Sequence, residues 1–162
     1  MPTRYSLLVF SRTFEPMVEE HDALKKRMRR LQHEVRADAA IADPIQLLRR
    51  TKDEFVDFMQ DLASYAAWEE HAIFPVVLPN ATHGPSTVTV LEHNVEISAH
   101  YFRTFLDMTR NEAAMEREAH AAEALSNMAL TLQHIGKYFK LEEQLVFPVS
   151  ERLMDTLAYN AQ

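Results

Sequence analysis

Residues 65–76 read Tyr-Ala-Ala-Trp-Glu-Glu-His-Ala-Ile-Phe-Pro-Val, and residues 138–149 read Tyr-Phe-Lys-Leu-Glu-Glu-Gln-Leu-Val-Phe-Pro-Val. Both segments follow the pattern Tyr-x-x-x-Glu-Glu-x-x-apolar-Phe-Pro-Val, and the second begins 73 residues after the first. Residues four apart lie one turn apart on the same face of a helix. A shorter repeat precedes each segment, because residues 18–22 (Val-Glu-Glu-His-Asp) are matched by residues 90–94 (Val-Leu-Glu-His-Asn). The chain is therefore predicted to use one unit twice, a helix with a histidine followed by a helix with Tyr-x-x-x-Glu.

The composition favours one soluble helical domain over the whole chain, residues 1–162, because only two glycines occur among many strong helix formers. A net charge of −7 argues against a nucleic-acid partner. The absence of cysteine excludes disulfides, thiolate metal sites and redox thiols. The apolar run from Leu7 to Phe10 is too short for a signal peptide or a membrane span. We therefore expect a cytoplasmic protein with no membrane partner.

Apolar residues spaced by three and four predict four amphipathic helices. Thr13 is predicted to cap the first helix, with Pro16 in its first turn, after an N-terminal extension. Asp43 and Pro44 are predicted to begin the second helix, and the third is expected to begin near Ser86. The inward positions are Phe14, Met17/Val18, His21, Leu24, Met28, Leu31 and Val35; Phe55, Phe58/Met59, Leu62, Tyr65, Glu69, Ala72/Ile73 and Val76; Val90, His93, Ile97, His100/Tyr101, Thr104 and Met108; and Leu125, Met128, Leu132, Ile135, Tyr138/Phe139, Glu142, Leu145/Val146 and Val149.

Four such helices with short connections predict an all-α fold, an up-down-up-down antiparallel four-helix bundle with an internal two-fold repeat. The repeat halves are expected to cover approximately residues 13–79 and 85–150, followed by a helical C-terminal tail over residues 151–159. Bundles of this kind build cofactor sites from inward side chains on facing helices.

Polar residues interrupt the apolar stripes at four matched positions. Glu69 and Glu142 fall on the buried stripes, whereas the glutamate that follows each points about 100° away. His21 and His93 occupy stripe positions on their own helices. A buried carboxylate must be paired, protonated or bound to a metal, because an isolated buried charge costs many kcal/mol. Two carboxylates and two imidazoles suit iron, manganese or zinc.

On these residues the chain resembles the haemerythrin-like (HHE cation-binding) family. That family is a four-helix bundle with a duplicated helix pair, and its motifs end in Glu-Glu-x-x-apolar-Phe-Pro. The resemblance covers roughly residues 21–148. It implies a ligand set of His21, Glu69, His93 and Glu142, with the two glutamates bridging two irons.

The chain departs from the family pattern at Tyr65 and Tyr138, where the pattern has histidines. A phenolate is a hard anionic ligand that prefers ferric iron, so this double replacement argues against reversible oxygen carriage. Two interpretations stay open: the tyrosines bind the metal directly, or they donate hydrogen bonds to the glutamates. His100 and His134 lie to one side of the expected metal level, as ordinary packed histidines or as the lining of an access path.

The resemblance implies a non-haem, di-iron protein that handles dioxygen, peroxide or nitric oxide, as a peroxidase or oxidase or as a sensor. Manganese or zinc are alternatives to iron. If the protein is an enzyme, it is expected to be a peroxide- or oxygen-dependent oxidoreductase. The second class of function is a metal-free interaction module with a Tyr-Glu-His hydrogen-bond network in its core. A minor alternative places haem between His21 and His93. The sequence leaves the oligomeric state open.

Overall fold

The computed structural model describes residues 4–38, 43–81 and 84–160, and every regular element in those ranges is helical. The prediction of an all-α protein is confirmed. The long helices are α1 (Arg4–Asp38), α2 (Pro44–Trp68), α4 (Gly84–Thr109), α6 (Glu118–Leu141) and α7 (Phe147–Asn160). The short elements are α3 (Phe74–Val77), α5 (Glu112–Met115), the 3-10 turn η2 (Leu78–Asn80) and the π-helical turns η1 (Glu69–Ile73) and η3 (Glu142–Val146). None of the helices in these ranges combines the length and hydropathy needed to cross a bilayer.

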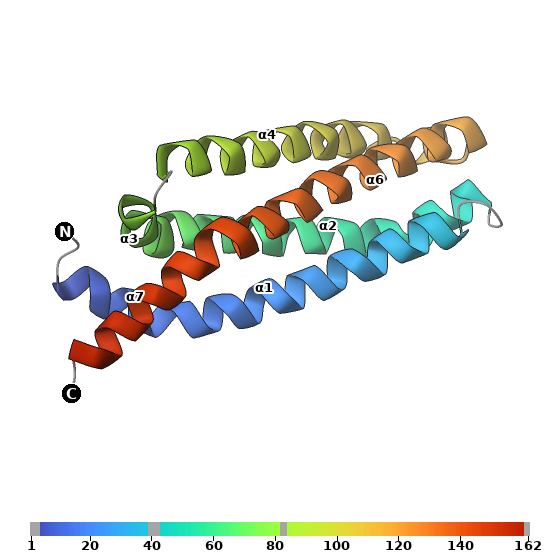
Figure 1. The fold of residues 1–162 in the computed structure, drawn as a ribbon. Coiled ribbons are helices and arrows are strands. Elements are labelled where there is room, and N and C mark those ends of the chain that lie inside the picture. Colours follow the sequence, from blue (N-terminus) through green and yellow to red (C-terminus); the bar gives the residue numbers. More distant parts are fainter. Residues whose placement is uncertain (1–3, 39–42, 82–83, 161–162) are drawn as a thin grey trace.

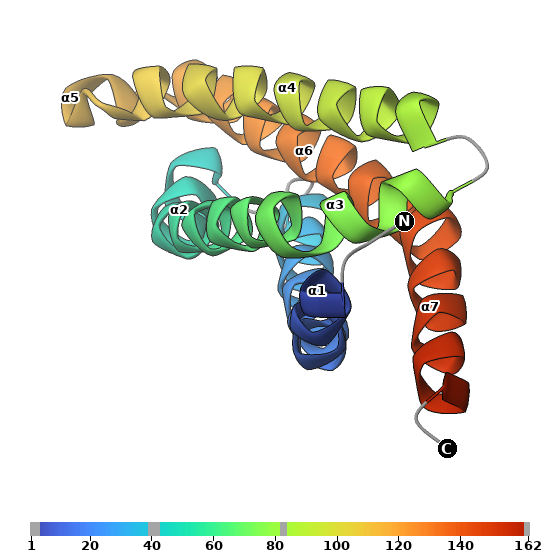
Figure 2. The same ribbon diagram turned by 90° about the vertical axis from the view of Figure 1, so that its left-hand side faces the viewer.

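All four of the longest helices extend across the view of Figure 1, and α7 continues from α6 beside the beginning of α1. Figure 2 shows α1 nearly end-on but α4 from the side, so these two helices are inclined to each other. Helix α6 is the centre of the packing, because it contacts α1, α2 and α4. Figure 2 shows α4 lying over α6 rather than over α2. Helices α2 and α4 meet through Phe55, whose ring lies 5.5 Å from that of Phe102 and 4.9 Å from that of Phe105. The arrangement is therefore uneven, with α4 attached mainly to α6.

The first helix is longer than predicted. It begins at Arg4, so Thr13 and Pro16 lie within it and neither marks its start. Thr13 Oγ1 instead donates a hydrogen bond to the Phe10 carbonyl, 3.0 Å away. Phe10 is buried and stacks on Phe14, which extends the apolar stripe backwards by one turn. This extra burial explains why the helix continues through a proline, a residue that normally favours the first turn.

Side-chain caps begin two of the helices, and the cap of the second predicted helix is the expected one. Asp43 accepts a hydrogen bond from the Ile45 amide at 3.0 Å, and Pro44 occupies the first turn of α2. Between α4 and α6, the Asn111 side chain accepts from the amides of Ala113 and Ala114 and begins the short helix α5. The helical C-terminal tail is also confirmed, as α7.

The predicted apolar stripes agree with the buried faces of α1, α2 and α6. The stripe predicted for α4 is wrong. In the first and second stripes every position is buried except Val18 and Ala72, which are half-buried. In the fourth stripe every position is buried except Leu145, which is exposed. In α4, however, the buried side chains include Leu91, Asn94 and Ser98, while Val90 and His93 are exposed. The inward face of α4 is thus displaced by one residue, which corresponds to a rotation of about 100°.

Candidate metal centre

Five of the six predicted ligand residues meet in the core. His21, Glu69 and Glu142 have no exposed surface, and Tyr65 and Tyr138 are 2% and 4% exposed. They come from three parts of the fold: α1 supplies the histidine, α2 with η1 supplies one Tyr-Glu pair, and α6 with η3 supplies the other. The two copies of the motif therefore face each other across the interior.

The two tyrosines form crossed hydrogen bonds between the repeats. The Tyr65 hydroxyl donates to Glu142 Oε2 at 2.8 Å, and the Tyr138 hydroxyl donates to Glu69 Oε1 at 2.5 Å. Each tyrosine thus holds the glutamate of the other motif, not the one in its own helix. Each carboxyl group is left with one oxygen that no tyrosine occupies.

A π-helical turn begins at each inward glutamate. In η1 the Phe74 amide donates to the Glu69 carbonyl, and in η3 the Phe147 amide donates to the Glu142 carbonyl, five residues back in both cases. Each donor directly precedes a proline, and a proline lacks the N–H that would continue the regular pattern. Single π-helical turns occur frequently at functional sites. The Phe-Pro pair at the end of each motif is the sequence signal for this turn.

His21 is fixed in orientation by aromatic rings and by Glu143. Its ring lies edge-on to Phe139 and Phe147, with centroids 4.9 and 4.7 Å away. Nε2 of His21 lies 3.0 Å from Glu143 Oε1, and Lys25, one turn further along α1, also donates to that oxygen. Because a carboxylate can only accept, the neutral imidazole carries its hydrogen on Nε2 and presents a lone pair at Nδ1.

Three polar atoms at this centre have no hydrogen-bond partner. Among the described residues, only four buried side-chain nitrogen or oxygen atoms are unpaired, and three of them are His21 Nδ1, Glu69 Oε2 and Glu142 Oε1. His21 Nδ1 lies 3.8 Å from Glu142 Oε1, which is too far for a hydrogen bond. Unpaired buried polar atoms are rare in folded proteins and call for an explanation.

The electrostatics of the centre hold protons on its acidic groups. Burial raises the pKa of Glu69 well above its ordinary value, and the nearby Glu142 raises it further. Burial also raises the pKa of Glu142 to about 7, although its interactions with Glu69 and Tyr65 oppose the increase. The pKa of each tyrosine is raised by burial and by the two carboxyl groups, so both stay protonated as phenols. Without a cation, at least one of the two carboxyl groups is therefore protonated near neutral pH.

Glu143 behaves differently from the glutamate beside it. Partial burial would raise its pKa, but the hydrogen bonds from Lys25 and His21, together with the positive charge of Lys25, outweigh that effect and lower it. Glu143 is therefore a carboxylate that holds the imidazole of His21. Neither Lys25 nor Glu143 was among the predicted site residues. The position of Lys25, four residues after His21, is the signal that could have identified it.

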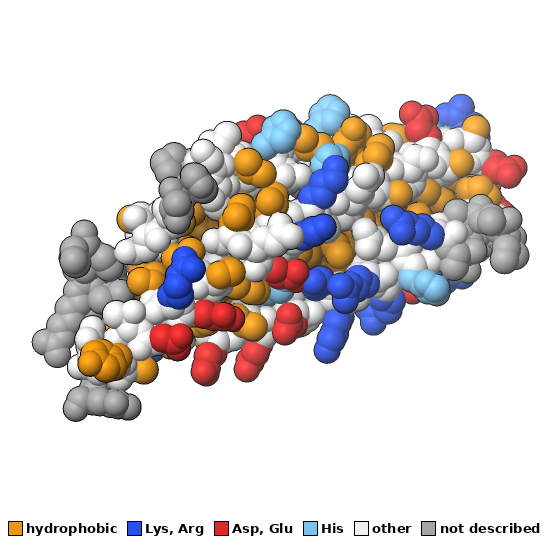
Figure 3. Space-filling view, in the orientation of Figure 1, with side chains coloured by type: hydrophobic (Ala, Val, Ile, Leu, Met, Phe, Trp, Pro, Cys, Tyr) orange, Lys and Arg blue, Asp and Glu red, His pale blue; other side chains and the backbone are white. Residues whose placement is uncertain are grey.

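His93 is not part of the centre, contrary to the prediction. It is exposed on α4, and the adjacent Asn94 is the buried residue, with its amide donating to the Val90 carbonyl at 2.9 Å. Histidine side chains are visible along the upper edge of the molecule, where α4 runs (Figure 3). The resemblance between residues 18–22 and 90–94 therefore does not extend to equivalent side-chain positions.

His100 on α4 and His134 on α6 belong to a separate aromatic group. The ring of Tyr101 stacks on that of His134 at 5.8 Å and meets that of His100 at 5.5 Å. Burial lowers the pKa of His134, and the charges of Lys137 and His93 act in the same direction. No hydrogen bond or ion pair recorded for the described residues joins this group to Glu69 or Glu142.

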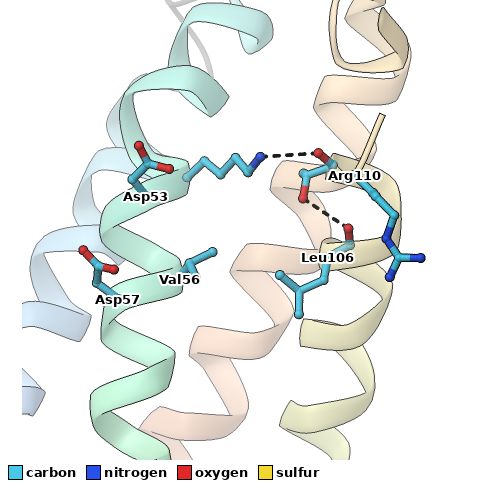
Figure 4. Close-up of a pocket in the computed structure, with 7 residues that line it drawn as sticks. Asp53, Val56, Asp57, Leu106 and Arg110 are labelled. Atoms are coloured by element: carbon cyan, nitrogen blue, oxygen red, sulfur yellow. Dashed lines mark hydrogen bonds between the residues drawn. The ribbon is translucent and has the colours of Figure 1, made fainter. Parts of the chain in front are cut away.

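A surface pocket at the other end of α2 offers no comparable chemistry (Figure 4). It lies between α2 and the end of α4, where Lys52 donates to the Thr109 carbonyl at 3.3 Å. The Thr109 hydroxyl in turn donates to the Phe105 and Leu106 carbonyls. Tyr65 is thirteen residues from Lys52, about 20 Å along the helix. Lys52 and Thr109 thus already have hydrogen-bond partners within the protein, unlike the unpaired atoms of the buried centre.

Comparisons with protein families, curated proteins and solved structures found no match. The interpretation of the centre therefore depends on its own geometry. Within residues 4–38, 43–81 and 84–160, no three imidazole or carboxyl side chains are placed to hold a metal ion as they stand. The buried donors without a hydrogen-bond partner at this centre are one imidazole nitrogen and two carboxyl oxygens, and each carboxyl group accepts a tyrosine hydrogen bond on its other oxygen.

Replacing Tyr138 by phenylalanine is expected to destabilise the metal-free protein by about 1–3 kcal/mol, because Glu69 would lose its hydrogen-bond donor in a buried position. Urea-induced unfolding measures this change. Tyr159→Phe is the matched control, since Tyr159 is 80% exposed and its substitution should change the free energy of unfolding by less than about 0.5 kcal/mol. Equal stability of Tyr138→Phe and the wild type would show that the crossed hydrogen bonds are absent.

Proposed function

We propose that the chain is a haemerythrin-like metal-binding protein, built on an antiparallel helical bundle, whose centre takes one transition-metal ion. The ligands would be His21 Nδ1, Glu69 Oε2 and Glu142 Oε1. The observation that carries this proposal is that these three atoms, from three parts of the fold, are buried and have no hydrogen-bond partner among the described residues. The exposed position of His93 favours one ion over the two that the family resemblance implies.

The charge and chemistry of the donors fit such an ion. Two carboxylates neutralise a divalent cation, and a mixed set of imidazole and carboxylate donors suits iron, manganese or zinc. Three protein ligands leave coordination positions open for a small molecule. Iron in this environment would bind and activate dioxygen, peroxide or nitric oxide.

The surrounding residues have the roles expected around metal ligands. A metal-binding histidine usually donates its second N–H to a carboxylate, as His21 does to Glu143. Tyr65 and Tyr138 hold the outer oxygen of each glutamate, which directs the other oxygen inward. Because each tyrosine hydroxyl donates a hydrogen bond to a glutamate oxygen, we assign both tyrosines to positioning the carboxylates and not to direct metal binding.

A metal-free core is the second candidate, and a specific observation favours it. The carboxyl groups can retain a shared proton, and the described imidazole and carboxyl groups do not form a ready-made cation site. The protein would then be a helical interaction module held by the Tyr-Glu-His network. Metal analysis separates the two candidates, because only the first takes up a stoichiometric ion.

Anaerobic titration of the chelator-treated protein with Fe²⁺, Mn²⁺ or Zn²⁺ tests the proposal. The wild type is expected to bind one equivalent. Glu143→Gln should weaken binding roughly 10- to 100-fold, the usual cost of losing the partner of a metal-bound histidine. Glu70→Gln is the matched control, since Glu70 holds the same position in the first motif but is exposed. Equal effects of the two substitutions, or no uptake by the wild type, would contradict the proposal.

A further inference from the structure

An apolar pocket opens where α2 and α4 separate beyond their contact at Phe55. It has a volume of about 190 Å³ and lies between α2, α4 and α6. Small side chains create the space: Ala63 and Ala66 on α2 face Ser98 and Ala99 on α4. An enclosed apolar cavity of about 150 Å³ is known to stay dry and to bind benzene. The pocket therefore has room for one aromatic ring.

Aromatic and aliphatic side chains form the inner wall of this pocket. Leu62, Phe102, Ile135 and Tyr138 line it, and Ser98 is the other polar lining residue besides Tyr138. The Ser98 hydroxyl already donates to the Val95 carbonyl at 2.8 Å. An aromatic ligand would gain contacts with the rings of Phe102 and Tyr138 as well as burial of its apolar surface.

A second pocket adjoins the first and is acidic at its rim. It has a volume of about 270 Å³ and shares Ala66, Val95 and Tyr138 with the apolar pocket. Its lining adds Glu70, Glu92 and Glu96, and all three are exposed. No lysine or arginine is among the described residues that line either pocket, and no ion pair recorded among those residues engages the three glutamates. A positive charge at this rim would meet only opposite charges.

We propose that the joined pockets bind a small arylalkylammonium ion, with its ring in the apolar pocket and its ammonium group at the glutamate rim. Charge complementarity selects the cation, and the ring of Phe74 at the rim offers a further attraction to it. Together the two volumes reach the range of about 300–1,000 Å³ that is typical of small-molecule sites. None of the assigned metal ligands lines this site, although Tyr138, which donates to Glu69, forms part of its wall.

Calorimetric titration of the chelator-treated protein tests the site with three probes of similar size: 2-phenylethylammonium, neutral 2-phenylethanol and anionic 3-phenylpropionate. The cation is expected to bind saturably and at least about tenfold more tightly than the anion, with the neutral alcohol in between. Failure of the metal proposal leaves this result unchanged, since no metal is present. Equal binding of cation and anion, or no binding of the cation at millimolar concentration, would overturn the inference.

Two sets of variants locate the binding site. Glu92→Gln and Glu96→Gln should each weaken cation binding by up to about fivefold and leave the alcohol unaffected, as expected for exposed charges. Ala99→Leu should fill the apolar pocket and reduce binding of both, whereas Ala129→Leu, another half-buried alanine in a different pocket, should not. If Ala99→Leu fails to fold, Glu92→Gln and Glu96→Gln still show whether the cation binds at this site. Unchanged cation binding in all the pocket variants would contradict the assigned site.

Discussion

Glu69→Gln is expected to lower the affinity for Fe²⁺ roughly 100- to 1,000-fold, and Glu142→Gln should do the same. Structural zinc sites with four ligands bind with about 10–16 kcal/mol, which is about 2.5–4 kcal/mol for each ligand. An amide in place of the carboxylate keeps the shape of the side chain and can still accept the tyrosine hydrogen bond. It cannot supply the negative charge that balances the cation. The loss should therefore appear in metal affinity and not in folding.

The measurement is a competition titration with a metal chelator, accompanied by circular dichroism to verify folding. Glu70→Gln is the control, because Glu70 is adjacent to Glu69 in the sequence but is exposed on the other side of the turn. Its affinity should match that of the wild type. Equal losses in Glu69→Gln and Glu70→Gln would mean that metal binding takes place on the surface.

The metal-free protein is expected to lose stability as the pH rises from about 5 to about 8. Burial raises the pKa of Glu142 to about 7 in the folded protein, from an ordinary value of 4.5. Below pH 4.5 the Glu142 carboxyl is protonated in both the folded and the unfolded chain, and the protonated carboxyl contributes fully to stability. Above pH 4.5 only the folded chain keeps this proton, so its contribution to stability falls and is lost as the pH rises through the folded pKa of about 7. At 1.36 kcal/mol for each pKa unit, the loss is about 3 kcal/mol at most.

Urea-induced unfolding across this pH window, with a chelator present, measures the effect. Glu142→Gln should make this fall smaller, because the amide does not titrate, while Glu143→Gln should leave most of the fall in place. The raised pKa of Glu69 acts in the same direction as that of Glu142. With metal bound the slope should reverse, since deprotonated ligands bind the ion more tightly at higher pH. A metal-free protein that becomes more stable between pH 5 and pH 8 would contradict the buried, proton-sharing pair.

The stripes of α1, α2 and α6 could be predicted because each has one dominant apolar face. Position 69 follows from Phe55, Leu62 and Val76, and the buried side chain of Glu69 confirms that phase. The third stripe was wrong because α4 carries apolar residues on two adjacent faces. Val90 and Leu91 are equivalent choices from the sequence, and only packing against α6 decides that Leu91 is buried.

The π-helical turns, the crossed Tyr-Glu pairing and the length of α1 depend on contacts that cannot be predicted from sequence periodicity. The π-helical turns at Glu69 and Glu142 are hydrogen-bond patterns, and a periodic stripe alone cannot distinguish them from regular helix. The crossed pairing of Tyr65 with Glu142 depends on how two distant helices face each other. The long α1 helix shows a third cause, since tertiary burial of Phe10 outweighs a local proline signal at Pro16.

Anomalous diffraction at the iron absorption edge, from crystals of the iron-loaded protein, would test the proposed centre most directly. We expect a single peak at bonding distance, about 2.0–2.2 Å, from His21 Nδ1, Glu69 Oε2 and Glu142 Oε1. A core without a peak, or a peak beside the exposed His93, would contradict the proposed centre.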